Sequence, residues 1–168
     1  MEFRFRLAKA DELLEIWQII TKAITRRKID GSNQWQDGYP NLNVLERDLH
    51  KKAAHVILEN DELVAYCAVS INDEPEYNNI KGKWLTNTDY VVFHRLAVAE
   101  NYLGKGVATT CFNLIHAFAK KNNINSIKAD TNFDNEPMLH LFKKFNYKYC
   151  GKVYFRGSER LAFEKLLH

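Results

Sequence analysis

The segment from Val91 to Asn122 constrains the fold more than any other, because it joins an apolar stretch, two closely spaced glycines and a long amphipathic pattern. The run from Val91 to Val98 is short and almost continuously apolar, which is typical of a strand covered on both faces. Gly104 and Gly106 follow it, and apolar residues then recur at helical spacing. The sequence therefore predicts a strand, a tight turn and a helix that begins within a residue or two of Gly106. The unpaired amides and the dipole at such a helix end favour an anionic group.

The spacing of the glycines differs from two common phosphate-binding patterns. A P-loop needs GxxxxGK[ST] and a dinucleotide-binding turn needs GxGxxG, and neither is present. The stretch from Asn101 to Ala108, NYLGKGVA, instead resembles the (Q/R)xxGxG(I/V)(G/A) turn of the GNAT superfamily of acyl-CoA N-acetyltransferases. It departs from that turn where Asn101 replaces Gln or Arg and where Leu103 replaces a common Arg. The resemblance implies that backbone amides of the turn wrap the pyrophosphate of coenzyme A.

A second stretch, from Asp130 to Gly151, resembles the other GNAT signature, in which NxxA precedes LYxKxGF. Asn135 takes the Asn position, whereas Phe142 stands where the family usually has Tyr. The residues support a helix here without the resemblance, because Asp134 or Asn135 is a good N-cap and Asn146 suits a left-handed helix end. Because the two signatures occur in the family's order, the resemblance covers nearly the whole chain.

Length and composition predict one domain over residues 1–168, and the resemblance implies that it is a GNAT acetyltransferase domain. Hydrophobic residues make up 46% of the chain, but no apolar run approaches the roughly 18 residues of a membrane span. The start of the chain lacks the features of a signal peptide, and three widely spaced cysteines favour reduced thiols. The net charge of +3 is too small to argue for nucleic acid, and no metal-ligand spacing occurs. We therefore expect a cytoplasmic monomer or homodimer with no membrane, nucleic-acid or metal partner.

The periodicity of the whole chain predicts a mixed α/β fold. Residues 72–88, rich in Asn and containing Pro75, read as a solvent loop. The order of strands and helices fits the GNAT-like fold, a central mixed sheet with splayed central strands flanked by helices. The resemblance implies that these strands end near Val98 and Asp130 and that pantetheine completes the ladder between them. Strands are expected near residues 2–7, 55–59, 63–71, 91–98, 126–130, 147–155 and 160–164, and helices near 11–28, 44–52, 107–119 and after 135.

The resemblance places the contacts with the cosubstrate acetyl-CoA (coenzyme A) on the end of the central strand, on the glycine turn and on one helix cap. These residues are Leu96, Ala97, Val98, Leu103, Gly104, Lys105, Gly106, Val107, Ala108 and Asn135.

Transfer of an acetyl group to an amine needs a donor for the oxyanion and a base for the amine proton. The backbone N–H of Val98 is the candidate donor. His94 is the candidate base, because histidine titrates nearest neutral pH and the strand period of two puts it on the face of Leu96 and Val98. The string HRLAV also resembles HALAV of arylalkylamine acetyltransferases, where a strand histidine helps to relay the proton. The alternative is a histidine packed in the core or turned toward the helices.

The acceptor is expected at the loop from Asn33 to Pro40, NQWQDGYP, in which Trp35, Gln36 and Tyr39 are the candidate substrate-binding residues. The two aromatic rings offer flat walls with polar tips. The string resembles DQWxxGYP of a group of uncharacterised bacterial GNAT proteins. The alternative is a loop that its aromatic residues pin over the core, and both interpretations can hold at once.

These residues and the resemblance together predict an acetyl-CoA-dependent N-acetyltransferase. Its acceptor is expected to be the primary amine of a small molecule or an amino-acid-like compound, which attacks directly in a ternary complex. One alternative is a protein or peptide N-acetyltransferase. Another is a catalytically silent acyl-CoA-binding module, because Phe142 cannot donate a proton to the departing thiolate. A thiolate with a pKa near about 8.5 is nevertheless a tolerable leaving group without an acid.

Overall fold

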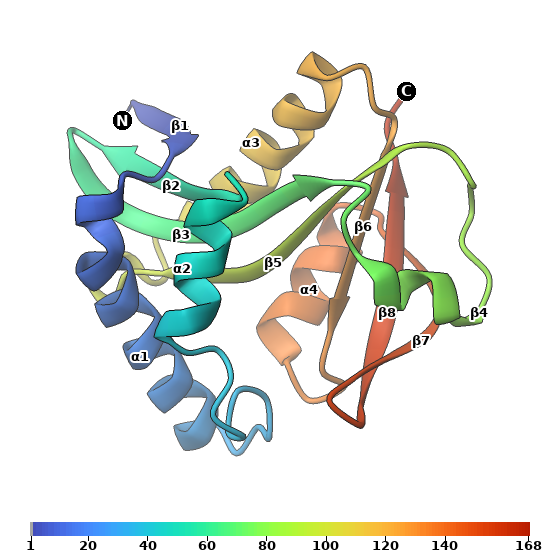
Figure 1. Cartoon of the computed structure of the whole chain (residues 1–168), viewed down its shortest axis with the longest axis horizontal. Coiled ribbons are helices and arrows are strands. Elements are labelled where there is room, and N and C mark those ends of the chain that lie inside the picture. Colours follow the sequence, from blue (N-terminus) through green and yellow to red (C-terminus); the bar gives the residue numbers. More distant parts are fainter. Residues whose placement is uncertain (1) are drawn as a thin grey trace. The chain divides into compact units, whose positions relative to one another are not determined.

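A computed structural model describes residues 2–168, and it confirms the mixed α/β fold (Figure 1). Within these residues eight strands form one sheet in the order β1-β2-β3-β5-β6-β8-β7-β4. The strands are β1 (Phe3–Leu7), β2 (Ala54–Glu59), β3 (Glu62–Ile71), β4 (Lys81–Gly82), β5 (Tyr90–Val98), β6 (Ser126–Thr131), β7 (Lys148–Phe155) and β8 (Ser158–Leu166). The helices are α1 (Leu13–Ile29), α2 (Leu42–His50), α3 (Val107–Lys121) and α4 (Glu136–Lys144), with short 3-10 turns η1 (Ala10–Glu12), η2 (Pro75–Asn79) and η3 (Glu100–Tyr102).

Contacts among the described residues divide the chain into two compact units. Unit 1 contains the residues up to Val69 together with His94–Ile115, and unit 2 contains Ser70–Phe93 and His116–His168. β3, β5 and α3 therefore contribute residues to both units. Of the site residues that the sequence predicts, all except Asn135 belong to unit 1.

The core of unit 1 forms where the apolar faces of α1 and α2 pack with β2 and β3, beside which both helices lie in Figure 1. Ile16, Ile19, Ile20 and Ala23 of α1 are all buried at helical spacing, as its amphipathic pattern predicts. The other buried members of this core are Leu45, Ala54, Val56, Leu58, Leu63, Tyr66 and Ala97.

The hairpin of β2 and β3 turns through Asn60 and Asp61, as the sequence predicts. Both residues have positive φ, 50° and 66°. This left-handed pair is the conformation of a type I′ turn, whose twist matches that of two antiparallel strands. Asn and Asp adopt it more readily than other residues with side chains.

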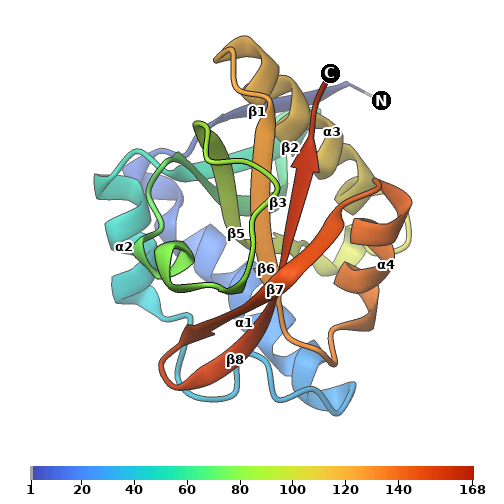
Figure 2. The same cartoon turned by 90° about the vertical axis from the view of Figure 1, so that its right-hand side faces the viewer.

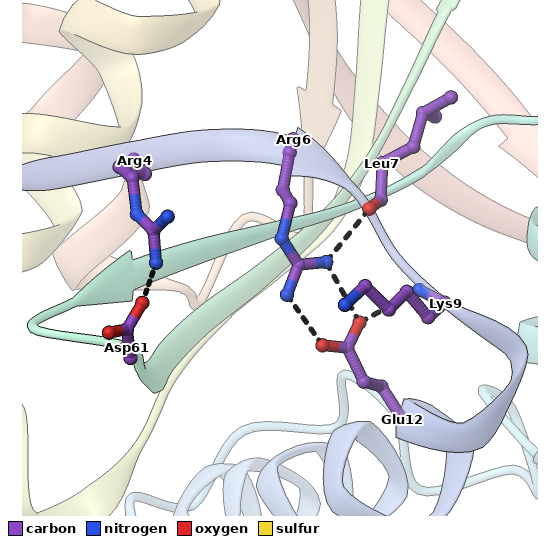
Figure 3. A network of polar contacts seen from close by, with 6 residues as sticks. All are labelled: Arg4, Arg6, Leu7, Lys9, Glu12 and Asp61. Carbon is purple, nitrogen blue, oxygen red and sulfur yellow. Dashed lines mark hydrogen bonds and ion pairs between the residues drawn. The ribbon is translucent and has the colours of Figure 1, made fainter.

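Charged contacts tie β1 to the start of α1 and to the β2–β3 turn (Figure 3). Nη2 and Nη1 of Arg6 donate to the two carboxylate oxygens of Glu12 at 2.6 and 3.1 Å. The same carboxylate accepts the backbone N–H of Lys9 at 2.7 Å. The hydrogen bond from Arg6 is the main cause that lowers the pKa of Glu12. Arg4 pairs with Asp61, so both ends of this edge strand are held.

The strands of unit 2 are covered on two sides: Figure 2 shows α4 on one side of β6, β7 and β8 and the segment before β5 on the other. Toward α4, Phe142 stacks on Phe163 of β8 with 4.6 Å between ring centroids. On the other side Tyr77 is 2% exposed and donates its hydroxyl to Asp130 at 2.6 Å. Most of residues 72–88 are exposed, as predicted, but Tyr77 anchors them, and they include η2 and β4.

Two further findings concern the chain as a whole. All three cysteines lie within the described residues and are buried as free thiols, as their apolar surroundings predict. Of the helices in residues 2–168, none has the length and apolar character needed to cross a membrane.

Candidate functional site

One residue interrupts the regular backbone of β5. Arg95 has a φ of 57°, a left-handed conformation that marks a β-bulge when it occurs inside a strand. The hydrogen bonds that flank it agree, since Asn72 N–H donates to Tyr90 C=O at 3.0 Å and Ala99 N–H donates to Val64 C=O at 2.8 Å. The step from Val64 to Asn72 is eight residues, whereas the step from Tyr90 to Ala99 is nine. β5 therefore carries one extra residue relative to β3.

The extra residue changes which peptide groups of β5 face β3. Successive residues of a strand direct their N–H and C=O groups to opposite edges. Tyr90 faces β3 before the bulge and Ala99 faces it after the bulge, so the set that faces β3 changes from even to odd positions. The peptide groups of Leu96 and Val98 consequently point to the opposite edge of the strand. The Val98 carbonyl indeed accepts Nη2 of Arg26, from α1, at 3.0 Å.

The turn between β5 and α3 has an open glycine backbone. Gly104 and Gly106 have φ values of 72° and 80°, in the left-handed region that favours glycine. Among the described atoms, a Cβ at either position would have no neighbour within 4 Å. Thr110 N–H donates to the Gly106 carbonyl at 3.0 Å, so the amides of Val107 and Ala108 precede the start of the helical ladder. Free space beside backbone amides that make no helical hydrogen bond, at a helix N-terminus, suits a phosphate.

The side chains of this turn divide into an anchor and an exposed rim. Val107 is 2% exposed and fixes the first turn of α3 in the core, while Ala108 beside it is half-buried. Leu103 and Lys105 are exposed, and Nζ of Lys105 lies 5.4 Å from the ring centroid of Tyr102. The backbone of the turn is therefore fixed by packing while its outer surface stays accessible.

Arg26 shows a donor without an acceptor beside the same strand. Its Nη1 is buried and, among residues 2–168, has no hydrogen-bond partner. Burial is the main cause that lowers the pKa of this guanidinium. A buried donor without an acceptor is unfavourable, which suits a ligand that brings a carbonyl or anionic oxygen to this edge. The outward peptide groups, the open turn and this donor fit a ligand that carries amides and phosphates.

His94 directly precedes the bulge and is half-buried. The period of two that predicts a shared face with Leu96 and Val98 is interrupted by the left-handed backbone of Arg95. The period of two therefore does not show that the His94 side chain shares a face with Leu96 and Val98. The role of His94 as a base stays a prediction.

The second signature lies in unit 2 and has the helix ends that the sequence predicts. Oδ1 of Asn135 accepts the N–H of Met138 at 3.3 Å, so Asn135 is the N-cap of α4. Asn146 follows the helix with a φ of 59°. Phe142 is 1% exposed, and its ring lies 5.2 Å from that of Tyr147. Phe142 is thus a packing residue, and the contact of Asn135 with coenzyme A stays a prediction.

The three predicted acceptor residues lie in one loop of unit 1, which is held at several points. Trp35 is half-buried against the core of α1, as expected for a pinned loop. Gln36 is exposed, but its Nε2 donates to the Ile24 carbonyl of α1 at 2.9 Å. The hydroxyl of Tyr39 accepts Nη1 of Arg95 at 2.5 Å. The loop is therefore attached both to α1 and to the bulged residue of β5.

A buried polar network surrounds Arg95 and joins residues that sequence reasoning did not select. Nε and Nη2 of Arg95 donate to the two oxygens of Asp48, from α2, at 2.9 and 2.6 Å. The Tyr66 hydroxyl, from β3, donates to Oδ2 of Asp48 at 2.5 Å. The Arg95 and Asp48 side chains are only 12% and 7% exposed. The signal in the sequence was Asp48 itself, because it lies three residues after the inward Leu45 and so shares the apolar side of its helix.

The charge of Arg95 is maintained by its partners. Burial lowers the pKa of Arg95, but the neighbouring Tyr39 and the Asp48 carboxylate together raise it by more than burial lowers it. The net shift of this pKa is therefore upward. Burial and the charge of Asp48 raise the pKa of Tyr66 well above its usual value. The network therefore holds one ion pair, between Arg95 and Asp48, beside the protonated hydroxyl of Tyr66.

A polar hollow of about 370 Å³ lies elsewhere, in unit 2. Asparagines and the carboxylates of Asp73, Glu74 and Asp89 line it. It has the wrong sign of charge for a polyanionic cosubstrate, and the residues that line it are not those that the sequence predicts for the site.

Comparisons with known proteins give one consistent result. The family model described as the acetyltransferase (GNAT) family matches residues 13–147. A GNAT-family acetyltransferase from Streptococcus agalactiae is 35% identical, with a TM-score of 0.88 over 99% of this chain and 96% of its own. A candidate acetyltransferase from Staphylococcus aureus Mu50 is 28% identical, with a TM-score of 0.74 over 98% and 99% of the two chains. No curated protein matches the sequence.

A more distant structure is informative about the fold. A Salmonella typhimurium protein solved with its cofactor acetyl-CoA is 13% identical, with a TM-score of 0.67 over 99% of this chain and 94% of its own. At this identity the likeness shows that the two proteins share a fold. The family match over most of the chain and the 35% identical relative over nearly all of it show more: this protein belongs to the GNAT family of acetyltransferases, enzymes that use acetyl-CoA.

Proposed function

We propose that this protein transfers an acetyl group from acetyl-CoA to the primary amine of a small molecule or an amino-acid-like acceptor, by direct attack while both substrates are bound. One observation carries the proposal: the bulge in β5 turns the peptide groups of Leu96 and Val98 outward just before the open glycine turn of α3. An extended ligand with amides at one end and phosphates at the other needs both features in this order.

The backbone of unit 1 supplies most of the proposed binding. The outward peptide groups of Leu96 and Val98 would continue their ladder with the pantetheine amides, and the turn from Leu103 to Ala108 would hold the pyrophosphate. Acetyl-CoA supplies the activated acetyl thioester. The Val98 N–H is the proposed oxyanion donor, because a peptide group fixed in a strand needs no reorganisation when charge develops.

Proton transfer is assigned to His94. An amine with a pKa near about 10 must lose a proton before it attacks, and a histidine or a water that it orients can accept that proton. The departing thiolate needs no acid, so the buried ring of Phe142 is compatible with turnover. Trp35, Gln36 and Tyr39 are the proposed acceptor residues, since the loop that contains them is attached to the bulged strand.

Binding and turnover measured separately test the proposal. We expect acetyl-CoA to bind in calorimetry and coenzyme A thiol to be released with some members of a panel of small amines and amino acids. Binding without release for any amine would support the silent module instead. Release only with peptides or proteins would support the protein acetyltransferase, and failure to bind acetyl-CoA would contradict the whole assignment.

The glycine turn can be tested with a matched pair of substitutions. Gly106→Ala and Gly157→Ala each add a methyl group at an open position, where φ is 80° and 74°. The backbone strain is similar in both, about 1–2 kcal/mol. We expect Gly106→Ala alone to raise the KM for acetyl-CoA about tenfold, because its methyl group takes up space beside the phosphate-binding amides. Equal KM values for the two variants would contradict the role of the turn.

The base can be tested through the pH dependence of the rate. We expect His94→Ala to lower kcat by about 10²-fold or more and to remove the acidic limb of the pH–rate profile. Acetyl-CoA binding should persist, because the proposed contacts with it are mainly backbone groups. An unchanged profile would remove His94 from the mechanism.

A further inference from the structure

Arg95 has two structural roles, one through its backbone and one through its side chain. Its backbone forms the bulge that turns Leu96 and Val98 outward. Its side chain is the centre of the network with Asp48, Tyr39 and Tyr66. The bulge and the network therefore cannot move independently of each other.

The geometry of the network fixes the direction of the Arg95 side chain. Two parallel hydrogen bonds to a carboxylate leave a guanidinium little freedom to rotate, and Asp48 is itself held by Tyr66. The remaining Nη1 then points at the Tyr39 hydroxyl. Through the Tyr39 hydroxyl, the loop from Asn33 to Pro40 reaches this network.

We propose that Arg95 is a positioning residue that couples the acceptor loop to the strand that holds the acetyl donor. Asp48 anchors the guanidinium, Tyr39 connects it to the loop, and the bulged backbone connects it to Leu96. This rests on the proposed function, in which the loop holds the amine and the strand holds the thioester. The coupling sets the separation between the two reactants, on which the rate depends steeply because a misplacement of about 1 Å can cost about 10²-fold.

Two tyrosines offer a matched test, because each contributes one 2.5 Å hydrogen bond to the same network from a different element. Tyr39→Phe removes the hydrogen bond between the loop and Arg95, whereas Tyr66→Phe removes one hydrogen bond of Asp48 and leaves both hydrogen bonds between Arg95 and Asp48 in place. We expect Tyr39→Phe to lower kcat/KM for the acceptor about tenfold and to change the KM for acetyl-CoA less than about twofold. We expect Tyr66→Phe to leave both values within about twofold. Its thermal midpoint should nevertheless fall by about as much as that of Tyr39→Phe. Equal kinetic losses in the two variants would overturn the proposal.

A double-mutant cycle separates positioning from direct contact between Tyr39 and the acceptor. If the hydroxyl acts through Arg95, Tyr39→Phe has little further effect on kcat/KM for the acceptor in an Arg95→Met background. If the hydroxyl contacts the acceptor, the two losses multiply, and the coupling role is rejected. Calorimetric binding of acetyl-CoA to each variant confirms that it is folded.

Hydrogen exchange gives a readout that needs no turnover. We expect Tyr39→Phe to speed amide exchange across residues 33–40 by about tenfold or more relative to Tyr66→Phe. Unchanged exchange there would reject the attachment of the loop even if the enzyme is active. Faster exchange in a protein that acetylates no amine would leave the attachment intact and reject the proposed function alone.

Discussion

The two units each bury a basic residue on a strand, but they stabilise it in different ways. In unit 1, Arg95 forms a two-point ion pair with Asp48. In unit 2, Lys128 of β6 is 4% exposed, and its Nζ lies 4.6 and 4.3 Å from the ring centroids of Trp84 and Tyr90. One cation is held by an opposite charge and the other mainly by aromatic faces.

The carboxylate of Glu164, opposite Lys128 in the sheet, is hydrogen-bonded to neutral groups. Glu164 lies opposite Lys128 in the ladder of β6 and β8. It accepts the backbone N–H of Leu85 and the hydroxyls of Thr86 and Ser126, at 2.6, 2.6 and 2.7 Å. Glu164 is therefore solvated by the protein itself, in the way that water would solvate it.

The pKa shifts separate the two arrangements. The pKa of Arg95 is raised despite its burial. Burial lowers the pKa of Lys128 against the opposing effect of Glu164, and burial lowers the pKa of His116, also in unit 2, to about 4. Arg95 thus keeps its charge at a fixed place, which suits positioning. Burial disfavours the charge on Lys128 and His116, which suits packing.

Removal of the carboxylate that pairs with Arg95 should have the largest effect. Asp48→Asn leaves a buried guanidinium without a counter-charge, so we expect a loss of about 3–5 kcal/mol in the free energy of unfolding, measured with denaturant. Asp30→Asn is the control, because Asp30 pairs with Arg27 at 2.8 Å but is 54% exposed, and it should cost less than about 1 kcal/mol. Equal losses would mean that the buried pair contributes no more than a surface pair.

Neutralising Glu164 should have a smaller effect, because its hydrogen-bond partners Leu85, Thr86 and Ser126 are neutral. In Glu164→Gln one oxygen becomes an NH₂ group that faces hydrogen-bond donors, so we expect a loss of about 2 kcal/mol by the same measurement. Glu159→Gln, at an exposed pair with Lys152, is the control and should change little. A loss as large as that of Asp48→Asn would indicate that unit 2 also relies on an ion pair.

The pH dependence of stability tests the half-buried His116 of α3. Because the folded pKa of His116 is about 4 and the unfolded value is about 6.5, the unfolded state binds more protons between these values. The wild-type protein should therefore lose stability as the pH falls from about 6.5 to about 4, and His116→Phe should lose less over that range. The exposed His140, replaced by Gln, is the control. Identical slopes for wild type and His116→Phe would contradict the shift.

Lys128 should give the smallest effect at neutral pH. In Lys128→Met the loss of the cation–π contacts is offset by the removal of a buried charge, so we expect a change within about 1 kcal/mol. The folded pKa lies below the unfolded 10.5, so wild-type stability should rise relative to Lys128→Met as the pH increases toward 10.5. Denaturation at about pH 7 and about pH 9.5 measures the difference, and a fall would reverse the assigned direction.

Features governed by neighbouring residues could be predicted from the sequence. The Asn60–Asp61 turn, the Asn135 cap and the left-handed Asn146 each depend on the intrinsic preference of one or two residues. The glycine turn belongs to the same class, because Gly104 and Gly106 permit a backbone that other residues avoid. Local chemistry alone decides these positions.

Features governed by distant residues could not be predicted. Arginine has no preference for a left-handed backbone, and the partner that holds Arg95 is Asp48, 47 positions earlier in the chain. Tyr77 lies in an Asn-rich segment, and its burial follows from the packing of that segment on unit 2. The period of two for His94 fails for the same reason, since the bulge that interrupts it is stabilised from α2.

The extra residue in β5 acts on the strand like a frameshift. Inserting or deleting one residue between Tyr90 and Ala99 would reverse the phase of the ladder and turn Leu96 and Val98 back toward β3. A change of side chain leaves that phase intact, whereas a change of length does not. Strands that hold a ligand through such a bulge should therefore keep their number of residues constant even where some of their side chains differ.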